Sequence, residues 1–331
     1  MPILDSTEYL FKALSPKRSE LGVHEEITIE TGVQLATGPV LCFVDYNGHI
    51  GLIIPADADQ FEKFTEDKKS RAIQLTRRKS QVEGHPTGYQ ARLVLRDRNQ
   101  RTVFYAFADK VLEFLDNNTD ARISDVAALL ARWRTFFSGS SEFSIDSHVE
   151  IGLLCELEVL LQLLEDEVPR AVEAWYGPLG DRHDFVLPDA ALECKASEST
   201  ERMILTVHGA QQLQPVEGKP LRLIFRRYQK HPDGSLSIPS LVEELQAHPS
   251  FNIETFLERI TNLGIDVFNP QHQDAFNRFF AVDVHEFEIT SEFPKVTINN
   301  SDGRIQNLQY NIDLAGPTAI PGYQEQPHYL R

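Results

Sequence analysis

Cysteine is scarce in this chain of 331 residues. Only Cys42, Cys155 and Cys194 occur, far apart and odd in number, which argues against a disulfide framework and against a Cys-x-x-Cys metal site. Charges interrupt every apolar run before it is long enough to span a bilayer. The first residues lack the basic flank and apolar block of a signal peptide. We therefore expect a protein of the reducing cytoplasm without a membrane partner.

Several enzyme motifs are also missing. The 11 histidines form no His-Glu-x-x-His or other paired-ligand spacing, which argues against a zinc hydrolase. There is no Gly-x-Gly-x-x-Gly or Walker loop, so the chain should not bind ATP itself. There is no Gly-x-Ser-x-Gly elbow, although composition alone does not exclude a serine triad.

Positive charge is in deficit, since 32 Lys and Arg stand against 49 Asp and Glu, for a net charge of −17. This argues against non-specific coating of nucleic acid, which depends largely on Lys and Arg. Residues 68–101 differ, with ten basic and two acidic side chains. They predict a phosphate-contacting surface, and the alternative is a solvated sheet edge. The candidate nucleic-acid-binding residues are Arg77, Arg78, Lys79, Arg92 and Arg96.

Turn residues and apolar periodicity predict two domains, 1–140 and 141–331, separated within the small polar segment 138–144. The first domain should be β-rich with a helical appendage, and Asn47-Gly48 is a strong hairpin signal. We predict a helix over 7–14, strands within 27–54 and at 72–82 and 89–96, a continuation of the sheet at 101–107, and helices over 109–115 and 123–137.

The second domain alternates helices and short strands. We predict helices over 148–167, 239–247 and 253–263, and strands over 184–187, 191–196, 203–207, from 221 onward, 279–290 and 305–314. This order predicts an α+β or mixed α/β fold in which a mixed sheet is flanked by helices.

One segment contains side chains that could form a catalytic site, GDRHDFVLPDAALECKAS at 180–197. Side chains alternate along a strand, so Glu193 and Lys195 share one face, while Cys194 points to the other as a small buried hydrophobe. The turn at 188–189 brings Asp184 beside Glu193. Two adjacent carboxylates need a neutralising cation, and oxygen ligands suit Mg²⁺. A metal would activate water, and Lys195 would stabilise developing negative charge on a phosphate.

The preceding helix adds a further acid. Glu156 lies in the middle of an apolar arc, whereas Glu158 falls on the polar side as a surface acid. A buried carboxylate needs a partner, which a metal site beneath the helix would supply. Acid-x-Lys pairs also occur at 66–68 and 67–69, so the residues alone leave two alternatives open, a nuclease and a structural salt bridge.

The segments GLLCELEVLLQLL, AWYGPLGDRHDFVL, ALECKAS and LQYNIDL resemble a bacterial family of PD-(D/E)XK-motif proteins over nearly the whole chain. The resemblance implies a restriction-endonuclease-like core with Glu156, Asp184 and Glu193 as metal ligands and Lys195 beside them. It also implies, more weakly, that Gln212 lies near the phosphate. His183 stands where the motif has Pro, and we expect it to be a hydrogen-bonded structural residue.

The family context implies an Mg²⁺-dependent DNA endonuclease, with Mn²⁺ as a substitute. It further implies a phage-defence or restriction-type gene cluster whose other members include a MORC-type ATPase and a superfamily II helicase. The alternative is a catalytically silent subunit for DNA binding or assembly. Nucleases that cut both strands often work as dimers, so a homodimer stays an open expectation. Trp175 and Tyr176 are expected to be packed aromatics, with base stacking as the alternative.

Overall fold

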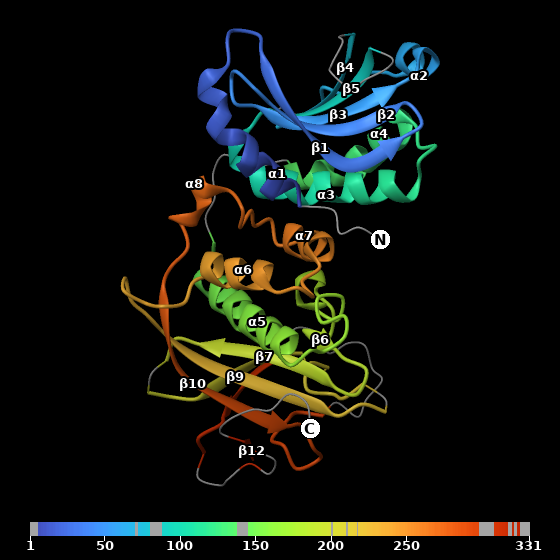
Figure 1. Cartoon of the computed structure of the whole chain (residues 1–331). Helices are drawn as coiled ribbons and strands as arrows, with labels where there is room; N and C mark the ends of the chain where they lie inside the picture. Colours follow the sequence, from blue (N-terminus) through green and yellow to red (C-terminus); the bar gives the residue numbers. More distant parts are fainter. Residues whose placement is uncertain are drawn as a thin grey trace. The chain divides into compact units, whose positions relative to one another are not determined.

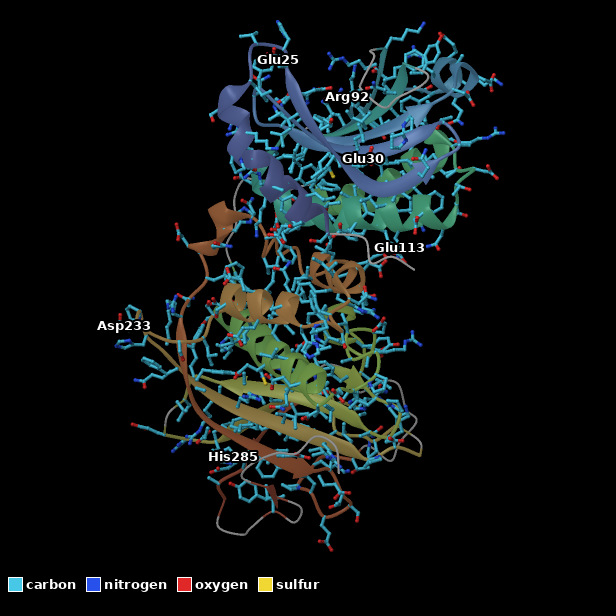
Figure 2. All side chains as sticks on the ribbon, in the orientation of Figure 1. Glu25, Glu30, Arg92, Glu113, Asp233 and His285 are labelled. Atoms are coloured by element: carbon cyan, nitrogen blue, oxygen red, sulfur yellow. The ribbon has the colours of Figure 1, made fainter. Side chains whose placement is uncertain are left out.

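The computed structural model describes residues 6–69, 72–79, 88–137, 145–199, 201–209, 211–216, 218–297, 308–316, 320 and 323–324. The chain forms two compact units, residues 1–140 and 141–331 (Figure 1). Its fold class is α+β with helices flanking the sheets, as predicted. Side chains fill the space between sheet and helices in each unit (Figure 2). Within the described ranges, no helix combines the length and apolar character needed to cross a membrane.

The first unit contains a five-stranded antiparallel sheet in the order β1-β2-β3-β5-β4. The predicted hairpin is confirmed, because Gly48, at φ +77°, closes the turn between β2 and β3. Asp45 stabilises this turn by accepting the His49 N–H at 2.8 Å. The strands are β1 (Glu26–Leu35), β2 (Gly38–Asp45), β3 (Ile50–Ala56), β4 (Ile73–Lys79) and β5 (Tyr89–Leu95).

Three helices cover one face of this sheet, α1, α3 and α4 (Figure 1). The prediction of a strand at 101–107 is wrong, since these residues open α3. Their aromatic and β-branched side chains suggested a strand, but Val103, Phe104 and Phe107 are buried with helical spacing. The helices are α1 (Thr7–Leu14), α2 (Ala58–Lys63), α3 (Arg101–Asn117) and α4 (Ile123–Trp133).

The second unit is built on a mixed sheet in the order β12-β10-β9-β7-β6, in which β7 and β9 are parallel and the other pairs antiparallel. A two-stranded sheet of β8 and β11 shares an apolar core with it, including Leu205, Leu223 and Phe287. The strands are β6 (Phe185–Val186), β7 (Ala191–Ser197), β8 (Ile204–His208), β9 (Leu221–Lys230), β10 (Phe279–Glu288), β11 (Gln309–Asp313) and β12 (Tyr323–Gln324).

Helix α5 (Ser147–Glu165) packs on β7, and α6 (Ile238–Ala247) packs on α5. Helices α7 (Ile253–Thr261) and α8 (Pro270–Gln273) complete the unit. Asp146 caps α5 by accepting the His148 N–H at 2.9 Å. The predicted strand residues 80–82 and 305–307, and the segment 138–144, lie outside the described residues.

Candidate active site

The pairing of β6 with β7 brings two acids together. Phe185 pairs with Leu192 and Val186 with Ala191, so the same register sets Asp184 opposite Glu193. Because β6 has only two residues, the next N–H of β7 bonds to a side chain: Cys194 N–H donates to Asp184 Oδ2 at 2.6 Å. This hydrogen bond holds the Asp184 carboxylate against the edge of β7.

Glu193 and Lys195 lie on the same face of β7, as strand alternation predicts. Lys195 Nζ is 2.7 Å from Glu193 Oε1. The other Glu193 oxygen is 3.4 Å from His183 Nδ1, and His183 Nε2 is 3.1 Å from the Gln214 carbonyl oxygen. His183 is therefore a buried, hydrogen-bonded residue that braces Glu193.

Glu156 reaches the same place from α5. Its Oε2 accepts the indole N–H of Trp175 at 2.6 Å. Trp175 is fully buried and stacks on Phe256 with ring centroids 5.6 Å apart, so the donor is fixed in position. Trp175 was predicted to be a packed aromatic, with base stacking as the alternative, and its hydrogen bond to Glu156 was not predicted. The signal that was available is that a buried indole N–H needs an acceptor.

Gly177 is the point at which the two acids meet. A Cβ at this position would overlap Glu156 Oε2 and lie 3.1 Å from Asp184 Oδ1. The backbone N–H groups of Tyr176 and Gly177 donate to the Asp184 carbonyl at 2.7 and 3.1 Å. The segment 175–177 therefore positions both carboxylates, and only glycine leaves room for them.

The acids carry more negative charge than their surroundings neutralise. Burial, reinforced by the Asp184 charge, raises the pKa of Glu156 well above its ordinary value. Burial, reinforced by Glu193, raises the pKa of Asp184 to about 7. Burial alone lowers the pKa of Lys195, but Glu193 and Asp184 outweigh it and raise that pKa overall. Three carboxyl groups therefore surround one ammonium.

This arrangement fits a hard divalent cation in donor type and in charge, because carboxylate oxygens are the ligands that Mg²⁺ prefers. Across the described parts of the chain, however, no three His, Cys, Asp or Glu side chains are already gathered as a metal-binding cluster. Glu193 is engaged by Lys195 and His183, which leaves Glu156 and Asp184 as a pair around Gly177.

The pair opens onto a cavity of about 790 Å³. Glu156, Asp184 and Lys195 line it, together with polar residues of α5, β7, β8 and β11, among them His148, Ser197, Thr206, His208 and Gln309. Sequence reasoning missed these residues, because no short motif links them. Gln212 is absent from the described lining and instead accepts the His208 N–H at 2.9 Å. The structure thus brings Glu156, Asp184, Glu193 and Lys195 together and does not place Gln212 among the residues that line the cavity.

Residues 8–315 match the family described as "Putative PD-(D/E)XK family member, (DUF4420)". The chain belongs to this PD-(D/E)XK family. The match spans both units and supports a nuclease-like fold for the protein. No curated protein and no solved structure matches the chain.

One acid of this PD-(D/E)XK protein is less exposed to solvent than predicted. Glu158 is not a surface acid: its side chain is 14% exposed, its Oε1 is 3.0 Å from Arg226 Nη1, and Tyr228 donates its hydroxyl to Oε2. The prediction would hold for a helix with one solvent-facing side. Helix α5 is instead covered by β7 on one side and α6 on another, so it has little polar surface.

The candidate nucleic-acid-binding residues of the first unit divide between two faces of the sheet. Arg77 donates to the Phe61 carbonyl of α2 at 2.9 Å, and Lys79 lies 4.9 Å from the centre of the Tyr89 ring. Arg78, Arg92 and Arg96 border a separate cavity. Strand β4, which carries 77–79, is an edge strand, so the sheet-edge alternative also stays open.

Gly177→Ala should displace the acids of the site. We expect a loss of about 1–3 kcal/mol in the free energy of unfolding, because a methyl group is forced into a filled space. The matched control is Gly152→Ala on α5, where a Cβ meets nothing within 4 Å and removing a helical glycine should stabilise by about 0.5–1 kcal/mol. Urea denaturation measures both, and equal effects would contradict the proposed crowding at Gly177.

Trp175→Phe tests the hydrogen bond to Glu156. Phenylalanine retains the stacking on Phe256 but removes the indole donor, so we expect a loss of about 1–3 kcal/mol from a buried carboxyl without its partner. The same substitution in a Glu156→Leu background should cost less, and urea denaturation of all four proteins gives the coupling energy. An identical loss in both backgrounds would show that Trp175 acts by packing alone.

Asp184→Asn tests the raised pKa through the pH dependence of stability without metal. A carboxyl whose folded pKa is raised from 3.8 to about 7 stabilises the fold at low pH, and this contribution is lost as pH rises toward 7. Each pKa unit corresponds to about 1.4 kcal/mol. Asparagine still accepts the Cys194 N–H, so with EDTA present the variant should gain stability relative to wild type between about pH 4 and 7. Parallel stability curves would rule out the raised pKa of Asp184.

Proposed function

We propose that this protein is a metal-dependent endonuclease that hydrolyses DNA phosphodiester bonds at Glu156, Asp184, Glu193 and Lys195. The observation that carries the proposal is the meeting of Glu156 and Asp184 at Gly177. Two half-buried carboxyl groups with raised pKa values, beside a half-buried lysine and open to a polar cavity, are costly for a purely structural site. Perturbed pKa values in a cavity are typical of functional sites.

Asp184 and Glu156 would hold Mg²⁺, or Mn²⁺ in its place, and Glu193 would join them when its carboxylate leaves Lys195. When bound, a divalent cation withdraws charge from the phosphate and lowers the pKa of water. Cation binding would also relieve the acid–acid repulsion that raises the pKa values. Trp175 and Cys194 keep the two acids in place through their N–H groups at 2.6 Å.

Lys195 would contribute positive charge where the phosphate develops negative charge. Its side chain is 21% exposed and lines the cavity, so the ammonium is accessible to a substrate while Glu193 orients it. Ser197 would offer its hydroxyl group to the phosphate backbone of a nucleic-acid strand in the cavity. Gln212 would act indirectly, by fixing the backbone of His208 in the cavity wall.

We further propose that the protein works in the cytoplasm within a phage-defence or restriction-type system, with DNA as substrate and with ATPase and helicase partners. This part follows from family context alone. The second candidate is a catalytically silent nuclease-fold subunit for DNA binding or assembly. The engagement of Glu193 by Lys195 and His183 favours it, because an occupied carboxylate is not presented to a metal.

Nicking of supercoiled plasmid with Mg²⁺ or Mn²⁺ tests the proposal. Wild type should nick, and Asp184→Asn and Lys195→Gln should lose at least about 100-fold in rate, as expected for groups that stabilise transition-state charge. Asp189→Asn is the matched control, since Asp189 is an exposed acid in the turn of the same hairpin and its loss should leave nicking unchanged.

Calorimetric titration with Mn²⁺ separates the two candidates. If the protein is an endonuclease, wild type should bind Mn²⁺ and Asp184→Asn should abolish that binding. This expectation holds whether or not partner proteins are needed for cleavage. Wild-type protein that neither binds metal nor nicks DNA would reject the endonuclease and leave the silent subunit. Metal binding without nicking would call for the same assay in the presence of the ATPase and helicase.

A further inference from the structure

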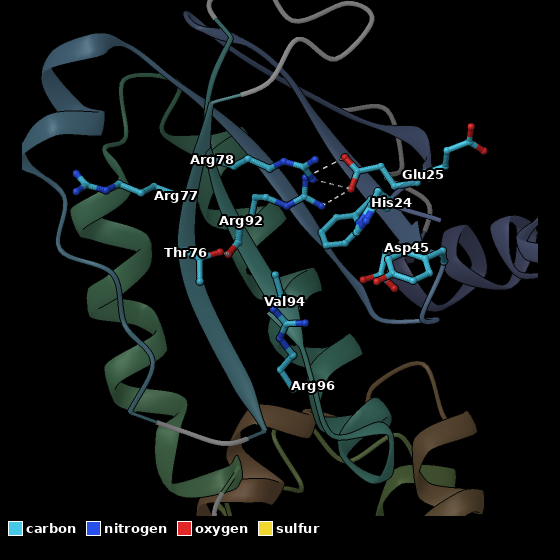
Figure 3. A pocket seen from close by; sticks show the side chains of 12 residues that line it. His24, Glu25, Asp45, Thr76, Arg77, Arg78, Arg92, Val94 and Arg96 are labelled. Atoms are coloured by element: carbon cyan, nitrogen blue, oxygen red, sulfur yellow. Dashed lines mark hydrogen bonds and ion pairs between the residues drawn. The ribbon is translucent and has the colours of Figure 1, made fainter. Parts of the chain in front are cut away.

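The first unit contains a cavity of about 350 Å³ beside β4 and β5 (Figure 3). Thr76 and Arg78 of β4 line it, as do Arg92 and Val94 of β5 and the adjoining Arg96. Alternation along β4 sets Ile73, Leu75 and Arg77 on the other face of the strand. Although Arg77 touches the cavity, its guanidinium is turned toward α2, where it binds the Phe61 carbonyl.

A carboxylate shared by two arginines lies in this cavity. Arg92 donates to both oxygens of Glu26 at 2.9 and 2.6 Å, and its guanidinium lies 4.1 Å from the centre of the Phe43 ring. Arg78 is 3.4 Å from the same carboxylate, and its side chain is 47% exposed. One negative charge therefore faces two guanidinium groups, which leaves the pair with excess positive charge and Arg78 with donors directed to solvent.

Arg96 adds a third guanidinium to the cavity. Its Nε is 3.3 Å from Gln74 Oε1 and its Nη1 is 3.3 Å from His49 Nδ1, while the residue remains exposed to solvent. The nearby acid Asp45 is already engaged, because it accepts the His49 N–H at 2.8 Å and lies 2.9 Å from His49 Nδ1. Arg78 and Arg96 are thus exposed cations that both line the cavity, and a planar guanidinium fork matches the geometry of phosphate.

Aromatic rings also border the cavity. His24 and Tyr46 both line the cavity, with ring centroids 5.6 Å apart in an edge-to-face arrangement. His24 has φ +75°, a left-handed conformation that is uncommon for a residue with a side chain and that is found more often at functional sites. The turn that holds it is closed by the Gly22 N–H, which donates to Glu25 Oε2 at 2.8 Å.

We propose that this cavity binds a single nucleotide unit, with its phosphate at Arg78 and Arg96 and its base against Tyr46 and His24. Arginine forks recognise phosphate, aromatic faces stack on bases, and the fixed Arg92–Glu26 pair offers donors and an acceptor to a base edge. The volume falls in the range of small-ligand pockets, about 300–1,000 Å³. The nucleotide could come from two sources: it could be a free mononucleotide or a nucleotide turned out of a DNA or RNA strand.

The division of basic residues between two faces makes this proposal testable. A diffuse phosphate-binding surface would use Arg77, Arg78 and Lys79 alike, because charge alone decides such binding. A nucleotide in the cavity would contact the Arg78 guanidinium. The Arg77 guanidinium is instead bound to the Phe61 carbonyl, and the Lys79 side chain lies on the other face of β4. Arg77→Gln and Arg78→Gln remove the same charge from adjacent positions of β4, so they form a matched pair.

The experiment uses the full chain in EDTA, so that binding is independent of metal and of cleavage. Calorimetry with adenosine monophosphate and with inorganic phosphate tests the free ligands, and fluorescence anisotropy tests a labelled single strand and a duplex with one unpaired base. We expect Arg78→Gln to weaken binding at least about tenfold, and Arg77→Gln by less than about threefold. Tyr46→Leu should weaken nucleotide binding by about tenfold.

Each outcome decides the question. Binding of the monophosphate assigns a free nucleotide, and binding of strands alone assigns a nucleotide within nucleic acid. Equal losses in Arg77→Gln and Arg78→Gln, phosphate bound as tightly as nucleotide, or no binding in any arm would overturn the proposal. Arg78→Lys keeps the charge without the fork and should give an intermediate loss, and thermal unfolding checks that every variant is folded.

Discussion

The burial of Glu156 and Asp184 against one another at Gly177 is the constraint on which the second unit depends. Both carboxyls are partly buried, and burial raises both pKa values; the Asp184 charge raises the pKa of Glu156 further, and the Glu193 charge raises that of Asp184. Trp175 and Cys194 donate N–H groups, and Lys195 supplies the ammonium. The shortness of β6 follows from the same constraint, because a longer strand would take the Cys194 N–H that now binds Asp184.

Helix α5 links this site to the sheet because it is buried on more than one side. Glu156 points to the cavity, whereas Glu158 binds Arg226 and Tyr228 of β9. Two acids only two residues apart therefore have different partners and different environments. The ion pair with Arg226 fixes the helix on β9, and this fixes the direction in which Glu156 approaches Asp184. Loss of the Glu158 contacts would consequently disturb the site without touching the cavity.

Local sequence patterns were sufficient to predict which charged residues form the candidate site. Strand alternation was enough to set Glu193 and Lys195 on one face, and the apolar arc of the helix singled out Glu156. The remainder depends on tertiary packing that no local pattern encodes. The aromatic segment at 101–107 fits a strand or a helix until its packing partner is known. Glu158 was predicted to be solvated because its partners Arg226 and Tyr228 lie 68 and 70 residues away, and the acceptor of the Trp175 N–H lies 19 residues away.

Each of the two cavities contains an ion pair of the same kind, but the uncompensated charge around that pair is negative in one cavity and positive in the other. In each, a cation is held by a carboxylate of the same sheet, Lys195 by Glu193 and Arg92 by Glu26. The excess charge around each pair then differs. Glu156 and Asp184 make the first environment negative, so a cation must enter before a phosphate is tolerated. Arg78 makes the second environment positive, so an anion can bind there directly. The sign of the uncompensated charge, rather than the net charge of −17, therefore decides what each cavity attracts.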